Sequence, residues 1–313
     1  EEGKWSKSEG IPGRLNSEYH DACLSISPDG QYIYIYKNFG ENGSGEIFES
    51  KLSSSGKWGA PKQLDENINT SFWESSASLT ADGNTMYYVS ERKGGFGMGD
   101  IWKSERISRS EWGEPVNIGS AINTPEDEKM VVIHPEGNVM FFASEGHKSI
   151  GGFDIYMSEY KNGKWQTPQN LGYPINTVED DVNFVLTKDG NKAYYSGFKK
   201  ETMGERDIYE IDVTNHNMLK SLREKYILVT GNITDASTGE SMKGSSSITI
   251  SDEAGTIIKS LKIGIAEGFQ TTIERNKKIN ITVNSSGYKE NTQVVFIKDK
   301  EKESETLDFK MTR

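Results

Sequence analysis

The stretch TADGNTMYYVSERKGGFGMGDIWKSE, residues 80–105, decides the fold of this 313-residue chain. It opens on the turn pair Asp82-Gly83 and continues into an alternating run that is rich in Tyr and Val. Alternation with a period of two predicts β-strands, and Asp-Gly is typical of a tight hairpin because glycine accepts a positive φ. The stretch therefore predicts a strand over residues 85–90, a glycine-rich loop, and a strand over residues 100–105.

The same pattern occurs four times, at a period of 53 or 54 residues. The turn pairs are Asp29-Gly30, Asp82-Gly83, Glu136-Gly137 and Asp189-Gly190. The third strands start at Glu46-Ile47-Phe48, Asp100-Ile101-Trp102, Asp154-Ile155-Tyr156 and Asp207-Ile208-Tyr209. A four-stranded unit repeated at a fixed period predicts the blades of a β-propeller.

Tryptophans mark the fourth strand of each unit, and they bear on the number of blades. They recur at Trp5, Trp58, Trp112 and Trp165, whereas the fourth copy ends near Val213 without one. We expect the strand at Trp5 to complete the last blade, which gives a four-bladed propeller. A fifth blade is the alternative, since four is the low end of the usual range.

Composition divides the chain near residue 213. Residues 1–213 carry 21 Lys and Arg against 34 Asp and Glu, whereas residues 214–313 carry 15 against 13. The acidic first part argues against nucleic acid and anionic membrane as partners, because both require clustered basic residues. No apolar run is long enough to span a bilayer, so no direct membrane insertion is expected. The single cysteine, Cys23, allows no intramolecular disulfide and is expected to be a buried small side chain.

Three segments follow from these patterns: a propeller over residues 1–213, a polar linker over 214–225, and a small β-sandwich over 226–313. The last segment alternates at 247–252 and 279–283. The sequence therefore predicts an all-β protein.

The repeats resemble the WD40-like PD repeats of TolB-type propellers, through Ser27-Pro28-Asp29-Gly30. Residues 229–240 and Ser286-Gly287-Tyr288 resemble the carboxypeptidase regulatory-like domain, a transthyretin-like sandwich. The order of the two domains is similar to the PorE-like group of OmpA-family envelope proteins of Bacteroidota. That resemblance implies a non-enzymatic scaffold of the type IX secretion system, periplasmic and associated with the outer membrane. It further implies protein partners among the other outer-membrane components, and peptidoglycan contact through a domain outside this chain.

Four acids recur eight residues before each turn acid, and an asparagine stands five residues before each of them. The acids are Asp21, Glu74, Glu128 and Asp181, and the asparagines are Asn16, Asn69, Asn123 and Asn176. In a propeller these acids would ring one mouth of the central channel, where Ca²⁺ or Mg²⁺ is the cation that such carboxylates would hold. Otherwise each carboxylate accepts backbone N–H bonds at a blade junction and is structural.

One aromatic pair breaks the repeat. Trp73 stands where the other copies have His20, Asp127 and Asp180, and Phe72 precedes it. A large aromatic present once at the mouth is a candidate contact for a protein partner. No hydrolase elbow, zinc helix, Walker loop or paired cysteine motif occurs, so no catalytic residue and no cofactor is assigned. The four histidines are interpreted as solvated, and a propeller-type glycan-binding module or glycoside hydrolase is the alternative function.

Overall fold

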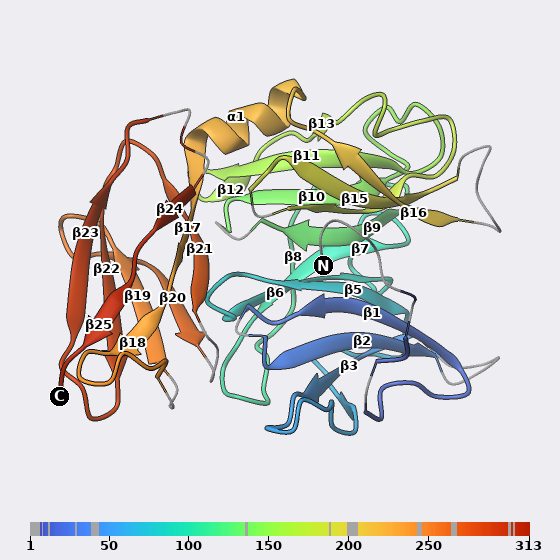
Figure 1. The fold of residues 1–313 in the computed structure, drawn as a ribbon. Helices are drawn as coiled ribbons and strands as arrows, with labels where there is room; N and C mark the ends of the chain where they lie inside the picture. The colour runs from blue at the N-terminus through green and yellow to red at the C-terminus, as the bar shows by residue number, and fades with distance from the viewer. Residues whose placement is uncertain are drawn as a thin grey trace.

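A computed structural model describes residues 7, 9–11, 13–28, 30–38, 44–134, 137–187, 189–198, 206–242, 246–263, 268–299, 302 and 304–313. Within these residues the chain is all-β apart from one helix, α1 (Asn217–Lys225), which confirms the predicted all-β class (Figure 1). No described helix is long and apolar enough to cross a membrane.

Four antiparallel sheets follow one another along the first part of the chain. The strands of each sheet pair in sequence order, except that both short strands at the end of the third sheet pair with its third strand. The first comprises β1 (His20–Ile26), β2 (Tyr32–Asn38), β3 (Glu46–Lys51) and β4 (Lys62–Gln63). The second comprises β5 (Glu74–Leu79), β6 (Thr85–Ser90), β7 (Asp100–Glu105) and β8 (Val116–Asn117). The third comprises β9 (Glu128–Ile133), β10 (Val139–Ser144), β11 (Asp154–Lys161), β12 (Lys164–Trp165) and β13 (Gln169–Asn170). The fourth comprises β14 (Val182–Leu186), β15 (Lys192–Gly197) and β16 (Asp207–Asp212).

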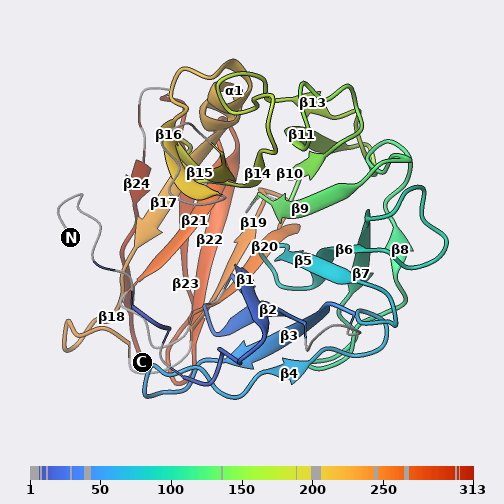
Figure 2. The ribbon, with the colours of Figure 1, turned by 90° about the vertical axis from the view of Figure 1, so that its right-hand side faces the viewer.

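The four sheets are arranged around a common centre, as in a propeller (Figure 2). Side chains alternate between the two faces of a strand, and the second and third sheets are apolar on both faces. One hydrophobic cluster therefore forms between each pair of consecutive sheets, which we call a junction. Tyr34 and Tyr88 share the cluster between the first and second sheets, and Phe141 and Phe184 share the one between the third and fourth. The turns form as expected, since Gly83 has a φ of 70° in the second hairpin.

The predicted polar linker is wrong, because α1 occupies most of it and belongs to the core. Leu219 and Leu222 are 0% and 6% exposed and lie in the cluster between the third and fourth sheets. Trp112 and Trp165 occupy the corresponding clusters at the two preceding junctions. Helix α1 thus supplies the apolar side chains at the junction where the repeat would place a fourth tryptophan. Trp5, which was expected to complete the last sheet, lies outside the described residues.

The second part of the chain forms three further sheets. Its strands are β17 (Tyr226–Gly231), β18 (Ile233–Asp235), β19 (Ser246–Ser251), β20 (Ile257–Ile263), β21 (Phe269–Glu274), β22 (Lys278–Ser285), β23 (Asn291–Phe296), β24 (Ser304–Thr306) and β25 (Phe309–Met311). The sheet orders are β21-β17-β24, β18-β25 and β20-β19-β22-β23. Ile248, Ile281 and Phe309 are fully buried in a single core cluster, to which strands from all three sheets contribute.

Tyr226 connects this second part to the third sheet. Its ring lies 5.7 Å from that of His134, and its hydroxyl accepts a 2.5 Å hydrogen bond from Asn138. His134 is 9% exposed, so the prediction that it is solvated is wrong. Burial, with a smaller contribution from the charge of Lys259, lowers the pKa of His134 to about 4.

Cys23 is exposed, which contradicts the expectation that it is buried. It lies on β1, the first strand of its sheet, and the corresponding Asn183 of the fourth sheet is exposed as well. The physical reason is that the first strand runs along the centre of the arrangement. The third sheet covers the corresponding Ser76 of the second, which is 5% exposed and donates to the Val131 carbonyl, whereas Cys23 and Asn183 are left exposed.

Candidate functional site

The repeated asparagines hold one sheet to the segment that leads into the next. The amide oxygen of Asn69 accepts the N–H of Ile47 at 2.8 Å, and its nitrogen donates to the Ile47 carbonyl at 2.8 Å. Asn123 makes the same pair of bonds with Ile101, and Asn176 with Ile155. A side-chain amide can satisfy both groups of one residue in this way because it carries a donor and an acceptor.

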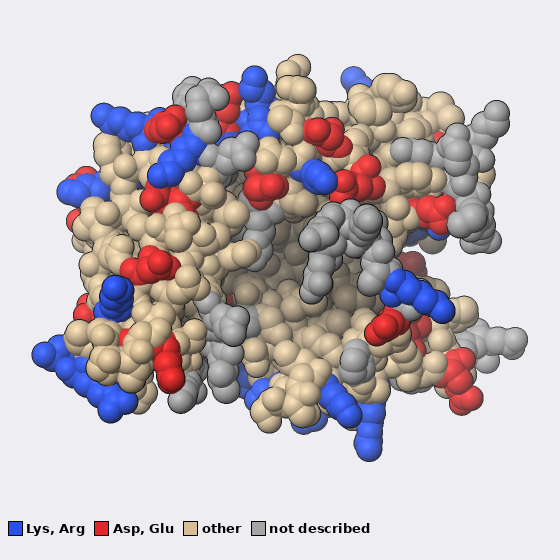
Figure 3. Space-filling model, in the orientation of Figure 1, with Lys and Arg blue, Asp and Glu red and all other residues tan. Residues whose placement is uncertain are grey.

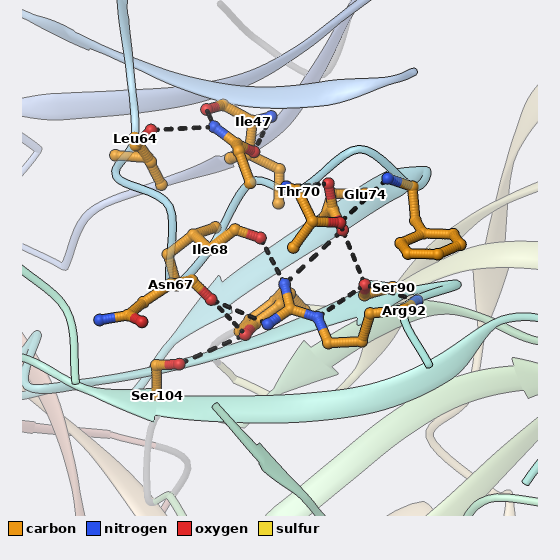
Figure 4. Close-up of polar contacts among 12 residues, drawn as sticks. Ile47, Leu64, Asn67, Ile68, Thr70, Glu74, Ser90, Arg92 and Ser104 are labelled. Carbon is orange, nitrogen blue, oxygen red and sulfur yellow. Dashed lines mark hydrogen bonds and ion pairs between the residues drawn. The ribbon is translucent and has the colours of Figure 1, made fainter. Parts of the chain in front are cut away.

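The repeated carboxylates accept hydrogen bonds from residues of the same segments. Glu74 accepts hydrogen bonds from the N–H and the hydroxyl of Thr70, at 2.8 and 2.6 Å, and from the Ser90 hydroxyl at 2.8 Å (Figure 4). Arg92 lies 3.6 Å from the carboxylate and donates to the carbonyls of Asn67 and Ile68. Glu74 is 0% exposed, so this buried charge is compensated by four groups.

The other three carboxylates make the same kind of contact. Each accepts from the N–H and the hydroxyl of the residue four positions earlier, namely Thr124 for Glu128, Thr177 for Asp181 and Ser17 for Asp21. The partner sixteen positions later varies. It is Ser144 for Glu128 and Lys37 for Asp21.

These contacts correct the expectation of an open ring of carboxylates at a channel mouth. Glu74, Glu128 and Asp181 are 0–1% exposed, and neighbours of their own repeats occupy the carboxyl oxygens. In the described part of the chain, no group of three or more His, Cys, Asp or Glu side chains could hold a metal ion. The carboxylates therefore have the second of the two predicted roles, in which each one accepts a backbone N–H bond and stabilises the segment between two sheets.

Glu128 differs from Glu74 in its partners: among the described residues, Thr124 and Ser144 donate to Glu128, whereas Glu74 also has Arg92 nearby. Burial raises the pKa of Glu128 to about 7, and the nearby charge of Asp100 acts in the same direction. The bonds from Thr124 and Ser144 oppose this rise. The site therefore has a carboxyl group that titrates near neutral pH without facing solvent.

Exposed apolar side chains gather at the end of the sheets where the first strands begin, which we call the strand-start face. Trp73 is 42% exposed there and stacks on Tyr36, with ring centroids 5.9 Å apart. Phe72 is only partly buried, and its N–H donates to the Thr70 hydroxyl at 3.0 Å. The described residues of this face expose further apolar side chains at Tyr19, Phe96, Met98, Ile150, Val178 and Phe198.

Close backbone packing joins these loops around the face. A Cβ at Gly97 would lie 2.1 Å from the carbonyl oxygen of Glu126, and one at Gly151 would lie 2.4 Å from the backbone of Val178. Only glycine allows this approach. Each glycine-rich loop therefore packs on the segment that enters the next sheet, and the exposed side chains belong to adjoining loops.

Sequence reasoning found Trp73 and missed most of its neighbours. Phe96 and Ile150 stand at the same position of two glycine-rich loops, four residues before Asp100 and Asp154. Met98 and Val178 have no apolar counterpart at the same position of the third and second copies, where Gly152 and Ser71 stand. The topology was the available signal, since antiparallel strands place these loops and the first-strand starts at the same end. His147 and His216 are half-buried and contact the carbonyls of Ile122 and Leu171, so they are not the solvated histidines that were expected.

No family model matches the chain, and no curated protein matches it. Among solved structures it is similar to an endo-arabinase from Bacteroides thetaiotaomicron, at 14% identity and a TM-score of 0.46, over 93% of this chain and 99% of that one. It is similar to a putative TolB from Agrobacterium tumefaciens at 11% and 0.38, over 82% and 91%. A puromycin-hydrolyzing peptidase of Mycobacterium tuberculosis matches at 13% and 0.38, over 61% of this chain and 27% of that one. The chain thus spans about a quarter of that peptidase, and none of these likenesses bears on its activity.

Proposed function

We propose that this chain is a non-enzymatic protein-interaction module, a propeller followed by a transthyretin-like sandwich. The observation that carries the proposal is the strand-start face, where exposed aromatic and aliphatic side chains lie in loops that pack on one another. Exposed apolar side chains grouped on one face are typical of interaction sites, and aromatic anchors supply much of the binding energy in protein interfaces. The second part of the chain packs through Tyr226 on the hairpin end of the third sheet, opposite the strand-start face.

The resemblance to PorE-like envelope proteins gives this module its setting. In that setting it would be periplasmic and associated with the outer membrane, as part of the type IX secretion system. Its partners would be other outer-membrane components, and the sandwich would separate the propeller from a peptidoglycan-binding domain outside this chain. The four described sheets would be the blades, with a fifth as the alternative.

A pull-down from envelope extracts, with the whole chain as bait, tests the proposal. Trp73→Ala should weaken binding of the main partner by about thirtyfold, since truncation of an aromatic anchor costs about 2 kcal/mol or more. Ile107→Ala is the matched control, because Ile107 is 70% exposed in a loop at the opposite end of the second sheet. Equal capture by the wild-type chain and Trp73→Ala would overturn the assignment of the face.

A glycan-binding module is the second candidate, because exposed Trp73 and Phe96 rings on one face also suit sugar stacking. The glycoside hydrolase alternative lacks such support, since the junction carboxylates are enclosed. A glycan array separates the two binding functions. A clear glycan hit, with no envelope protein recovered, would replace the scaffold proposal with the glycan-binding one.

A further inference from the structure

The strand-start face contains one arrangement of side chains twice, once between the second and third sheets and once between the third and fourth. Each copy has an exposed apolar residue in a glycine-rich loop and an exposed glutamate at the start of that loop. A second exposed glutamate lies in the segment that enters the next sheet. The two copies are Phe96, Glu91 and Glu126, and Ile150, Glu145 and Glu179. The structure describes every residue of the four segments that carry them, 91–99, 124–127, 145–153 and 177–180.

The apolar residue is held in the same way in both copies. The N–H of Phe96 donates to the Asp100 carboxylate at 2.7 Å, and the N–H of Ile150 donates to the Asp154 carboxylate at 2.6 Å. The side chains of Phe96 and Ile150 are 51% and 54% exposed. Because a large apolar side chain is exposed twice at one position of the repeat, this position is typical of an interaction surface.

Matching hydrogen bonds also hold the backbone of the four glutamates. At the loop starts, the N–H groups of Glu91 and Glu145 donate to the carbonyl of the residue before the repeated acid, at 3.0 and 3.1 Å. In the entry segments, the N–H groups of Glu126 and Glu179 donate to the hydroxyl of the threonine two residues earlier, both at 3.2 Å. The fold therefore presents the same three side chains from two neighbouring positions.

The four segments are acidic. They contain six Asp and Glu against three Lys and Arg, and one of the three, Arg92, is buried beside Glu74. The sandwich differs, because Lys and Arg side chains are interspersed with acidic ones over the side that Figure 3 shows on the left. The excess of negative charge is thus placed beside the exposed apolar side chains of the strand-start face.

Two of the six acids have basic partners, and the four glutamates do not. Asp127 and Asp180 pair with Lys129 and Arg206, at 3.7 and 2.5 Å. Within the described part of the chain, none of the four glutamates forms an ion pair. Burial, and then the negative charge of Asp127, raise the pKa of Glu91, so like charges already oppose one another on this face.

We propose that the two copies form a docking site for an extended protein segment in which Lys or Arg residues alternate with apolar ones. The apolar residues of the segment would cover Phe96 and Ile150, and its cations would lie beside the exposed glutamates. Charge complementarity selects this partner, because the four carboxylates would repel an acidic segment and would gain no ion partner from a neutral one. This inference rests on the proposed function, since it names the partner chemistry for the same face.

Peptide binding to the whole chain tests the site. The probe is a fluorescein-labelled peptide of repeated Lys-Leu-Gly, followed by fluorescence anisotropy at physiological ionic strength, where only charges within about 8 Å act strongly. The expected result is saturable binding that weakens about tenfold in Glu126→Gln/Glu179→Gln, since each lost charge pair is worth a factor of about three. Phe96→Ser/Ile150→Ser should weaken binding by about tenfold or more, because it removes the apolar contacts.

Glu111→Gln/Glu114→Gln is the matched control. It makes the same change of charge at exposed residues on either side of Trp112, and it should bind the peptide like the wild type. Equal binding by the wild type and Glu126→Gln/Glu179→Gln would overturn the proposal, as would equal weakening by the control pair. Absence of saturable binding, or equally tight binding of a repeated Glu-Leu-Gly peptide, would also overturn it.

The pull-down from envelope extracts separates this inference from the proposed function. Glu126→Gln/Glu179→Gln should reduce capture of the main partner, as Trp73→Ala does. Capture that is lost with Trp73→Ala but is unchanged with Glu126→Gln/Glu179→Gln would overturn the docking site and leave the proposed function intact. Both glutamine variants should melt like the wild type, because they alter exposed side chains.

Discussion

Asparagine and carboxylate side chains do more for this fold than their polarity suggests. Asn69 satisfies both backbone groups of Ile47, and Glu74 satisfies the N–H and hydroxyl of Thr70 four residues earlier. Each buried polar group is costly alone and stabilising once its partners are present. Because the contacts recur in successive copies, we interpret the acids that were a candidate ion site as residues that stabilise the segments between consecutive sheets.

Glu128 gives a prediction for the pH dependence of stability. Its pKa in the folded chain is about 7, above the ordinary 4.5, so the folded state binds this proton more tightly than the unfolded state. This contribution to stability is therefore present at low pH and is lost as the pH rises from about 4.5 to about 7. Glu128→Gln should remove the loss and raise the melting temperature more at pH about 8 than at pH about 5.

Glu74→Gln is the control for that measurement. It removes the charge that compensates buried Arg92, so it should lower the melting temperature at both pH values, at a cost of about 3–5 kcal/mol. A Glu128→Gln chain that melts like the wild type at the higher pH would show that Glu128 is not the titrating group.

Helix α1 is the element that changes the repeat. Its apolar residues, Leu219 and Leu222, are buried in the cluster between the third and fourth sheets. In the two preceding clusters, Trp112 and Trp165 are the buried side chains at the equivalent place. The polar residues between the two leucines made the segment look like a linker. A short amphipathic helix gains its stability from packing rather than from its composition.

Leu219→Ala should destabilise the propeller by about 2–5 kcal/mol, because it empties a fully buried site. Urea unfolding followed by tryptophan fluorescence reports on the propeller specifically, since all six tryptophans lie in residues 1–213. Lys220→Ala, on the exposed side of the same helix, should change stability by less than about 0.5 kcal/mol. Equal midpoints for the two variants would mean that the segment acts only as a tether.

At the scale of the whole molecule, Tyr226 joins the second part of the chain to the third sheet. Tyr226 stands at the start of β17 and contacts His134 and Asn138. Burial holds the pKa of His134 at about 4, below its ordinary 6.5. The neutral ring is therefore the form that fits this interface, and protonation opposes the contact.

Acidification should loosen this contact. Because the folded-state pKa of His134 is depressed, its contribution to stability is present above about pH 6.5 and is lost as the pH falls toward about 4. Hydrogen exchange in β17, corrected for the intrinsic pH dependence, should rise over that window. His134→Asn should flatten the rise, and His20→Asn, at an exposed histidine, should not. An identical pH profile for all three chains would contradict a role for His134.

The repeat, the all-β class and the strands could be predicted from the amino-acid sequence alone, because hydrophobic alternation and turn glycines are local signals. It also located the junction acids and Trp73, which follow from register between copies. Only the folded structure shows that the acids are enclosed, that α1 belongs to the core, that His134 is buried and that Ile208 is 80% exposed. These properties depend on which surfaces meet after folding, and no periodicity in the chain records that an identical isoleucine is buried in three sheets and exposed in the fourth.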